Sequence, residues 1–369
     1  MKVSIITVCL NSACTIEQTI KSVLNQTYKD IEYIIVDGES TDGTQDIIKK
    51  YQKYIAKYVS EPDRGLYDAM NKGIRMSSGD VIGIINSDDW YDLQTVEKVV
   101  RLFQENAADV VYGDELLIYE SGVEQRRVTG PITDLVCRMN LSHPTVFVKR
   151  ELYEKFGVFD RRYKIAADYD FLLRLYRKGV KMVECPEILA YFRMGGLSIK
   201  NGVLCADETK AIATKYLEQD EREACLPIIE KEHKFRIKRC YTQETMRKIL
   251  NFSECIDIKE LILKNVKNAE RVYIFGAGDI GREVYEFLCG INLKIEGFLD
   301  NSEKKIGKEY LKKTVQRTVD VRNKSPFIII AVLFHQEEIR RQLCAEGYIE
   351  DEDFCIYADF IEHVKNMLV

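Results

Sequence analysis

Two adjacent carboxylates directly follow the apolar run VIGII, in the sequence Asn86-Ser87-Asp88-Asp89. Carboxylates side by side at the mouth of a buried strand repel each other and raise each other's pKa unless a cation lies there. Because hard oxygen ligands favour Mg²⁺ and Mn²⁺, the pair predicts a divalent-cation site. A turn with an Asx cap before Trp90 is the structural alternative.

A second polar loop, residues 37–44, follows the apolar run IEYIIV. Asp37 ends that run and could accept a hydrogen bond from a base or a ribose, while the N–H groups at the start of the next helix stay free for capping. Ser, Thr and Asp before a helix are also ordinary N-caps, so this loop by itself does not decide between the two readings.

A glycine-rich turn lies towards the other end of the chain. Gly276, Gly278 and Gly281 form GxGxxG between the run RVYIF and a helical pattern, and Asp300 ends the next strand pattern, 19 residues after Gly281. This spacing suits a ribose-binding carboxylate in a Rossmann unit, with a pyrophosphate at the helix N-terminus. The unit is too short for a separate substrate domain and has no Tyr-x-x-x-Lys pair, which argues against hydride transfer. Binding of a nucleotide or sugar nucleotide and a role in assembly both stay open.

The segments that carry the first loops alternate between apolar runs and helical patterns. The runs VSIITVCL, IEYIIVDG and DVIGIINSDD are separated by patterns such as TIEQTIKSVLNQ and TQDIIKKYQKYI. This alternation predicts an α/β fold, with a parallel sheet, helices on both faces and sites at the carboxyl ends of the strands. We expect three parts: an α/β domain over 1–202, a helical connector over 203–268, and a smaller Rossmann-like α/β domain over 269–369.

The composition limits the partners of the chain. Its 369 residues include 54 Lys and Arg against 59 Asp and Glu, a net charge of −5. We therefore expect neither a general polyanion binder nor a nucleic-acid partner. No stretch reaches the ~18 apolar residues of a membrane span, and the start MKVSIITVCLNSA lacks the length and cleavage site of a signal peptide. The 11 Cys are scattered without a CxxC pair, which favours reduced thiols in a cytoplasmic protein.

A basic stretch interrupts this acidic background between Lys231 and Leu250, where seven Lys and Arg residues stand against two Glu residues. A basic helix can lie on anionic lipid headgroups, so the inner face of the cell membrane is a candidate partner. A solvated helix face is the alternative, because charge runs often indicate no more than that.

An ordered set of longer motifs runs through the first 200 or so residues. TVCLN, VDGESTDGT, SEPDRGLYDAMNKG, NSDDW, HPTVFVKR, GVFD, ADYDFLLR and FRMGGLS follow one another in that order. Together they resemble family 2 glycosyltransferases of the GT-A fold, in the branch for bacterial polysaccharide biosynthesis. The C-terminal unit resembles the small Rossmann-like domains attached to bacterial sugar-modifying enzymes.

The first resemblance implies a nucleotide-sugar donor and a role for each position that matches the motifs. The implied donor-binding residues are Thr7, Asn11, Asp37, Asp63, Arg64, Asn71, Lys72 and Asp88. Asp88 and Asp89 match the acidic metal-binding motif, although Asn86 replaces its first carboxylate. Met70 stands where many relatives have Arg, so which cation contacts the donor is open.

The same resemblance implies that Asp168 is the catalytic base. Its motif often reads Glu-Asp and here reads Ala167-Asp168. Asp170 is a rival, but two residues further along a helix its side chain points about 200° away, so the two should not share one task. His143 and Asp170 are candidate acceptor contacts, although a lone His before Pro is often a structural residue.

We therefore expect a metal-dependent, inverting glycosyltransferase. It would move a sugar from a UDP-hexose or UDP-N-acetylhexosamine to a hydroxyl of a polysaccharide or a lipid-linked oligosaccharide precursor. A base on the face of the sugar opposite the leaving group gives a single in-line displacement. One alternative is a bifunctional enzyme whose C-terminal domain also acts on a sugar nucleotide with NAD. Another is a non-enzymatic sugar-nucleotide sensor or scaffold. A second copy of the chain is a further candidate partner.

Overall fold

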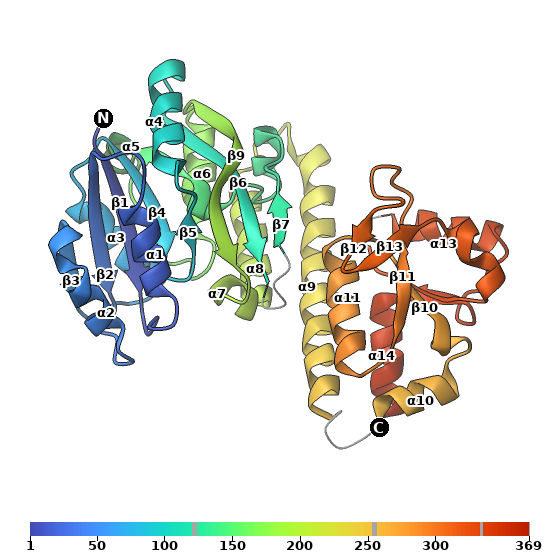
Figure 1. Cartoon of the computed structure of the whole chain (residues 1–369). Coiled ribbons are helices and arrows are strands. Elements are labelled where there is room, and N and C mark those ends of the chain that lie inside the picture. The colour runs from blue at the N-terminus through green and yellow to red at the C-terminus, as the bar shows by residue number, and fades with distance from the viewer. Residues whose placement is uncertain (120–123, 253–256, 333–334, 369) are drawn as a thin grey trace. The chain divides into compact units, whose positions relative to one another are not determined.

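The computed structural model describes residues 1–119, 124–252, 257–332 and 335–368 (Figure 1). Its contacts divide the chain into two compact units, Met1–Lys234 and Phe235–Val369. Within the described ranges, no helix is both long enough and apolar enough to cross a bilayer.

The first unit is built on a mixed sheet. Its strands are β1 (Val3–Cys9), β2 (Ile31–Asp37), β3 (Lys57–Ser60), β4 (Val81–Asn86), β5 (Trp90–Tyr91), β6 (Val110–Ile118), β7 (Glu124–Arg127), β8 (Phe147–Lys149) and β9 (Met182–Arg193). The order is β3-β2-β1-β4-β8-β6-β9-β5, with β7 paired to β6. Strands β1 to β4 run parallel to one another, as the sequence predicted for β1, β2 and β4, whereas β8 runs antiparallel to β4 and β6. The loops after β1, β2, β3 and β4 therefore leave the sheet at the same edge.

Helices cover both faces of this sheet. They are α1 (Ile16–Leu24), α2 (Thr44–Lys50), α3 (Leu66–Met76), α4 (Thr95–Asn106), α5 (Arg150–Phe156), α6 (Ala167–Arg177), α7 (Leu197–Lys200) and α8 (Gly202–Tyr216). Successive side chains of a strand point to opposite faces. In β1, Ile6 and Val8 join one core with residues of α3 and α6, whereas Val3 and Ile5 join the other with residues of α1 and α4. Because of this pattern, α3 and α6 share one face of the sheet.

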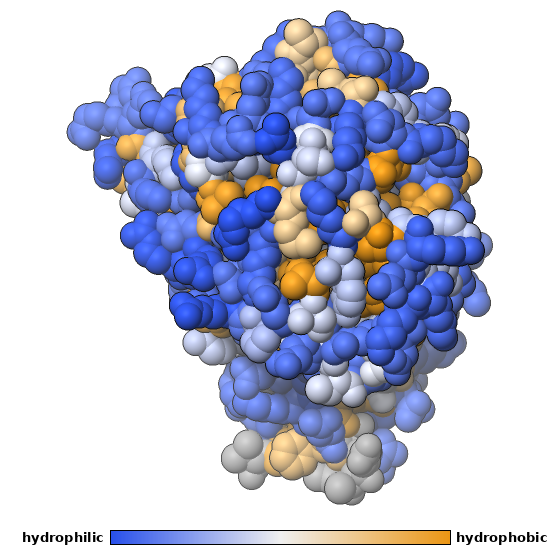
Figure 2. All heavy atoms as spheres, turned by 90° about the vertical axis from the view of Figure 1, so that its left-hand side faces the viewer, coloured by the Kyte–Doolittle hydropathy of each residue, from blue (hydrophilic) through white to orange (hydrophobic). Residues whose placement is uncertain are grey.

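Figure 2 shows the side of the molecule on which β3 and α2 lie. Hydrophilic residues cover most of this surface, and hydrophobic residues show between them near its middle. The hydrophobic side chains of the adjoining strands are directed inwards, since β2 is buried at every position after Ile31.

The second unit is a smaller α/β body. Its strands are β10 (Val272–Phe275), β11 (Ile295–Leu299), β12 (Glu309–Tyr310), β13 (Lys313–Gln316), β14 (Phe327–Ile330) and β15 (Phe354–Ile356), and its helices are α10 (Ile258–Asn265), α11 (Asp279–Gly290), α12 (Thr318–Val321), α13 (Gln336–Ala345) and α14 (Tyr357–Met367). The order is β12-β13-β11-β10-β14-β15, and all pairs except β12 with β13 are parallel. Counted along the chain, the parallel strands follow the order 3-2-1-4-5 of a doubly wound sheet.

The long helix α9 (Arg222–Phe252) carries Pro227 inside it. Ile229 is buried in a core of the first unit, and Met246 and Ile249 are buried in a core of the second. The boundary between the units by contacts therefore falls inside α9, at 234/235. The sequence analysis predicted a connector over 203–268, and the helices are present, but their side chains are shared between the two units. The three-part division stays a prediction.

Candidate functional site

The loops after β1 and β2 brace each other at the carboxyl edge of the first sheet. The backbone N–H of Asn11 donates to Ser40 Oγ at 2.8 Å. The side-chain oxygen Oδ1 of Asn11 accepts from the Thr41 N–H at 2.9 Å. Asn11 has φ of 51°, a left-handed conformation that Asn tolerates better than most residues. Asn11, which the sequence analysis predicted to contact the sugar donor, thus holds the loop after β1 against the loop after β2.

Asp37 is fully buried and joins three segments at this edge. Its Oδ2 accepts from the Ser40 N–H at 3.1 Å and from Ser60 Oγ at 2.6 Å, and its Oδ1 accepts from Ser40 Oγ at 2.5 Å. Burial and Asp37 together raise the pKa of the Cys9 thiol. Thr7 is also fully buried, and its hydroxyl accepts from the Tyr33 hydroxyl at 3.1 Å. Thr7 and Asp37, which the sequence analysis predicted to contact the sugar donor, are both buried. Asp37 holds the loop after β2, and Thr7 contacts β2 through Tyr33.

Asp63 lies against the end of β2. A Cβ added to Gly38 would come within 2.5 Å of Asp63 Oδ2, so a side chain there would displace the carboxylate. Asp63 Oδ1 accepts from the Gly65 N–H at 2.8 Å, which fixes the start of α3. Arg64 is exposed beside it. The structure therefore leaves Asp63 and Arg64 at the surface of this edge.

Asn71 and Lys72 have other partners. Asn71 is buried, and its amide donates to Phe159 O at 2.9 Å and accepts from Phe159 N at 3.0 Å. Lys72 Nζ donates to Pro62 O at 2.8 Å and lies 3.0 Å from Glu61 Oε1. Both polar ends of the Asn71 side chain are occupied by the backbone of Phe159, and the donor contact predicted for Asn71 stays a prediction. Lys72 holds the preceding loop.

The acidic pair after β4 divides into a buried and a more accessible carboxylate. Asp89 is 1% exposed, and its Oδ1 accepts from the Arg193 N–H at 3.0 Å. Burial raises the pKa of Asp89 well above its ordinary value, and Asp88 adds to that. Asp88 is half-buried, and burial raises its pKa too, while Arg193 and Lys200 oppose the rise. The sequence-based expectation of raised pKa values at this pair agrees with the structure.

The pair also offers oxygen atoms that lack partners. Within the described ranges, the buried Oδ2 of Asp89 and Oδ1 of Asn86 have no hydrogen-bond partner. The same part of the chain holds no group of three His, Cys, Asp or Glu side chains that could bind a metal together. Mg²⁺ is commonly held by one or two carboxylates with substrate phosphates and water. The pair therefore fits a cation that takes its other ligands from a substrate.

Arg193 and Lys200 are functional candidates to which the sequence analysis assigned no role. The Arg193 guanidinium lies 5.2 Å from the centre of the Trp90 ring and donates to Gln18 Oε1 at 2.8 Å and to Asp88 O at 3.3 Å. A Cβ on Gly196 would lie 3.4 Å from Asp88 Oδ2. The end of β9 and α7 therefore flank the acidic pair. Arg193 belongs to the motif FRMGGLS. The signal that could have indicated its position beside the acidic pair is the opposite charge of the motif NSDDW.

Asp168 lies in the first turn of α6, half-buried. The Tyr67 hydroxyl is 2.9 Å from Asp168 Oδ1 and 2.7 Å from Ile165 O. Tyr67 belongs to the start of α3, which follows β3 and so lies at the carboxyl edge of the sheet. Asp168 is therefore brought to the same edge as the acidic pair. Neither Tyr67 nor its bond to Asp168 was predicted from the sequence.

His143 lies near enough to Asp168 to feel its charge. Burial lowers the pKa of His143, and Asp168 opposes that shift. The His143 ring packs 6.2 Å from the Phe159 ring, between centroids. A neutral imidazole in this place fits the predicted contact to an acceptor, and that role stays a prediction.

Asp170 has a structural environment. It is 2% exposed, and its carboxylate pairs with Lys215 at 2.8 Å and with Arg174 at 3.3 Å and accepts from the Tyr216 hydroxyl at 3.1 Å. Its charge is thus compensated inside the protein, on the side of α6 that meets α8. The acceptor contact predicted for Asp170 stays a prediction, and these ion pairs do not favour it.

The glycine-rich turn of the second unit has the tight geometry that its motif requires. Gly276 has φ of 116°, and a Cβ at Gly281 would lie 1.9 Å from Gly276 O. Asp300 Oδ2 accepts from the Ala277 N–H at 3.1 Å and pairs with Lys305 at 3.0 Å. Asp300 therefore faces the turn, as the spacing predicted, although it contacts the backbone there. Ligand binding at this turn stays a prediction.

The basic stretch of α9 is partly neutralised within the chain. Arg239 pairs with Glu283 of α11, Lys248 lies 2.8 Å from Glu244, and Lys238 lies 3.9 Å from Asp359. Contact with anionic lipid stays a prediction.

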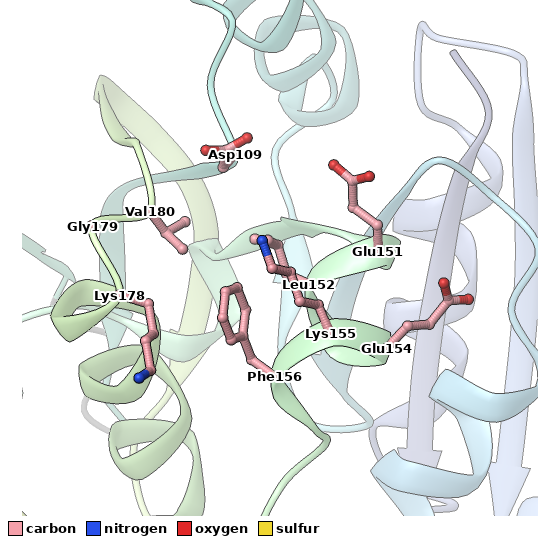
Figure 3. A pocket seen from close by; sticks show the side chains of 9 residues that line it. All are labelled: Asp109, Glu151, Leu152, Glu154, Lys155, Phe156, Lys178, Gly179 and Val180. Carbon is pink, nitrogen blue, oxygen red and sulfur yellow. The ribbon is translucent and has the colours of Figure 1, made fainter.

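A hollow of about 620 Å³ lies elsewhere on the first unit (Figure 3). It is lined by Asp109, Glu151, Leu152, Glu154, Lys155, Phe156, Lys178, Gly179 and Val180. Figure 3 shows Phe156 at its centre, with charged side chains of both signs around it. None of the predicted site residues lines it.

The chain is similar in sequence to known proteins. A sequence model described as glycosyl transferase family 2 matches residues 4–189, and one described as C2185-like, N-terminal, matches residues 268–353. A PGL/p-HBAD biosynthesis glycosyltransferase of Mycobacterium bovis is 30% identical over 202 residues, which cover 53% of this chain and 78% of that protein. An uncharacterized glycosyltransferase of Mycobacterium tuberculosis is 34% identical over 183 residues, covering 47% of this chain and 68% of that protein.

Solved structures share the fold at lower identity. The crystal structure of S. aureus TarS aligns with a TM-score of 0.52 and 19% identity, covering 63% of this chain and 43% of that chain. That of S. aureus TarS 1-349 aligns with a TM-score of 0.52 and 16% identity, covering 70% of this chain and 84% of that chain. The present chain thus spans less than half of the longer TarS chain.

The mixed sheet, with its acidic pair and Asp168 at one edge, is that of a glycosyltransferase of the GT-A fold. From the match over residues 4–189 and the relatives above, the chain belongs to glycosyltransferase family 2. The family and fold predicted from the sequence are confirmed.

Proposed function

We propose that the chain is a divalent-cation-dependent, inverting glycosyltransferase that uses a UDP-sugar. The observation that carries the proposal is the hydrogen bonding of the Asp168 carboxylate. One of its oxygens, Oδ1, is held by the Tyr67 hydroxyl, whereas no described residue donates a hydrogen bond to Oδ2. A carboxylate with one oxygen fixed and one open is suited to take a proton from an acceptor hydroxyl.

The acidic pair and its basic neighbours would bind the diphosphate of the donor. Asp88 is the accessible carboxylate, and Asp89, held through the Arg193 N–H, supports it from below. A bound Mg²⁺ or Mn²⁺ would act as a Lewis acid that stabilises the charge of the leaving nucleoside diphosphate. Lys200, whose charge acts on Asp88, adds positive charge at the same place. Asp63 and Arg64, at the end of β2, are the remaining candidates for donor contacts.

Asp168 would act from the acceptor side. As the acceptor oxygen bonds to the anomeric carbon, its proton passes to Asp168 Oδ2, and the bond to the leaving phosphate oxygen breaks. A base opposite the leaving group inverts the anomeric centre, so an α-linked donor gives a β-linked product.

A lipid-linked or polysaccharide precursor is our proposed acceptor. The segment that flanks the acidic pair exposes four aliphatic side chains, those of Leu197, Ile199, Val203 and Leu204. Exposed apolar side chains gathered next to a site can bind an apolar ligand. Gly196, directly before them, adjoins Asp88.

The test is a panel of UDP-sugars with purified protein, in Mn²⁺ and in EDTA, with lipid-linked and water-soluble acceptors. We expect transfer from one class of UDP-sugar only with Mn²⁺, and a product of inverted anomeric configuration by NMR. Retention of configuration would contradict Asp168 as the base. Equal rates in EDTA would contradict the cation, and transfer from GDP-sugars alone would contradict the donor.

A further inference from the structure

Tyr67 places a buried hydroxyl against the proposed base. The side chain is 5% exposed, and its ring packs on Phe159 with 5.4 Å between centroids. The hydroxyl lies within hydrogen-bond distance of Asp168 Oδ1 and Ile165 O. A phenol has one proton to donate, so these two acceptors share it. Tyr67 is therefore placed to respond to the charge of Asp168.

Tyr67 stays a proton donor at neutral pH. Burial raises its pKa well above the ordinary value, and the negative charge of Asp168 raises it further. A neutral hydroxyl that donates to a carboxylate makes a stronger hydrogen bond than one that donates to an uncharged oxygen. The contact therefore holds the Asp168 carboxylate at Oδ1.

The backbone around Asp168 is fixed separately by Glu208 of α8. Glu208 Oε1 accepts from the Lys164 N–H at 2.7 Å, and Oε2 accepts from the N–H groups of Ile165 and Ala166 at 2.9 and 3.0 Å. Ala166 is the N-cap of α6 and has no side chain that could cap the helix. Glu208 thus holds the loop in front of α6, which leaves the direction of the Asp168 side chain to be set by Tyr67.

We propose that Tyr67 is a positioning residue that holds Asp168 Oδ1 and so directs Oδ2 to the acceptor hydroxyl. When Asp168 takes the acceptor proton, the acceptor O–H bond breaks and an Oδ2–H bond forms. Asp168 is then neutral, and the Tyr67 proton keeps Ile165 O as its acceptor, so no buried donor loses its partner. The hydroxyl acts on the reaction through Asp168 and does not touch the sugar. This inference rests on the function proposed above.

The test compares Tyr67→Phe with Tyr153→Phe. Tyr67→Phe removes the hydroxyl and keeps the ring that packs on Phe159. Tyr153 is the matched control, because it is also buried and packs on Phe159, at 6.1 Å between centroids. We expect Tyr67→Phe to lower kcat about tenfold, as for loss of a hydrogen bond to a charged group, with KM for the donor unchanged. Tyr153→Phe should behave as wild type in both kcat and KM.

An unchanged kcat in Tyr67→Phe would overturn the proposal, as would equal losses of kcat in both variants. A second readout needs no activity: the ¹³C chemical shift of the Asp168 carboxyl carbon, assigned by its loss in Asp168→Asn. A shift that changes in Tyr67→Phe but not in Tyr153→Phe supports the positioning role even if no acceptor is turned over. A shift unchanged in Tyr67→Phe contradicts it. Failure of the wild type to transfer sugar would count against the proposed function alone.

Discussion

The side-chain amide of Asn71 makes hydrogen bonds with both backbone groups of Phe159. It donates to the carbonyl at 2.9 Å and accepts from the N–H at 3.0 Å. The pair joins α3 to the loop that leads to α6, since Phe159 lies ahead of that helix. We expect Asn71→Ala to leave two buried backbone groups without partners, at a cost of about 1–3 kcal/mol for each. Chemical denaturation should show this loss, while the affinity for UDP stays near that of wild type. A normal stability with lost UDP binding would instead restore Asn71 to the donor site.

Asp168→Asn should abolish transfer and keep donor binding. The amide cannot accept the proton of the acceptor hydroxyl at neutral pH, but it has nearly the same size and can still accept from Tyr67. We expect kcat to fall by about 10³ or more, with the dissociation constant of UDP unchanged by calorimetry. Asp160→Asn is the control, because Asp160 lies in the preceding loop and pairs with the exposed Arg162. Transfer by Asp168→Asn at a rate near wild type would assign the base elsewhere.

The acidic pair should make the protein respond to Mn²⁺ in a pH-dependent way. The folded-state pKa values of Asp88 and Asp89 are raised, mainly by burial. The folded state therefore binds extra protons, the two charges cost stability above the raised pKa, and this cost is relieved as the pH falls. We expect Mn²⁺ with UDP to raise Tm by more at pH 7 than at pH 5. Asp89→Asn should lose this shift, and Asp92→Asn, a control acid paired with Lys98, should keep it. Equal shifts in all three proteins would contradict a cation at the pair.

Glu32 should make the first unit sensitive to acid. Burial raises its pKa, but hydrogen bonds from Ser4 and Ser78 outweigh burial and, together with Lys57, lower the pKa from 4.5 to about 2. A lowered pKa contributes stability above the ordinary value, and this is lost as the pH falls through the folded-state value. The shift corresponds to roughly 3 kcal/mol. In urea titrations, Glu32→Gln should be less stable than wild type at pH 7, and the difference should shrink between pH 5 and pH 2. A constant difference would show that its charge contributes nothing.

The two glycines at the start of α11 should behave in opposite ways. A Cβ at Gly281 would lie 1.9 Å from Gly276 O, whereas nothing lies within 4 Å of a Cβ at Gly278. Gly281→Ala should therefore destabilise the second unit, and Gly278→Ala should fold as wild type. If a nucleotide binds the turn, Gly278→Ala should weaken binding of NAD or of a UDP-sugar to this unit, because a methyl group would block close approach of phosphate. Binding unchanged in a folded Gly278→Ala protein would argue against a phosphate there.

The sequence predicted much of this molecule. The alternating apolar runs predicted parallel β1, β2 and β4, because such local patterns reflect which side chains are buried. The ordered motifs predicted the family. The antiparallel direction of β8 (Phe147–Lys149) was not predicted, because the direction of so short a strand is set by its long-range pairing, here with β4 and β6.

For the site, the sequence named Asp168 and the acidic pair as candidates, but it did not predict the contacts that support them. Asn71 lies in a motif that runs beside the donor in relatives, yet its side chain points to Phe159, which is 88 residues away. Tyr67 and Glu208 reach the loop before α6 from two separate helices, and no spacing in the sequence indicates such contacts. A motif identifies which residue types are present, whereas their partners depend on how α3, α6 and α8 pack.

Helix α9 supplies Ile229 to one core and Met246 to the other. During synthesis on the ribosome, the first unit cannot complete its core when its last sheet strand emerges, because it must wait for about 40 further residues. The remainder of the same helix then becomes available to the second unit before its first strand, β10, has been made. One helix therefore ends the folding of the first unit and begins that of the second, so a chain terminated before Ile229 would lack part of the core of its first unit.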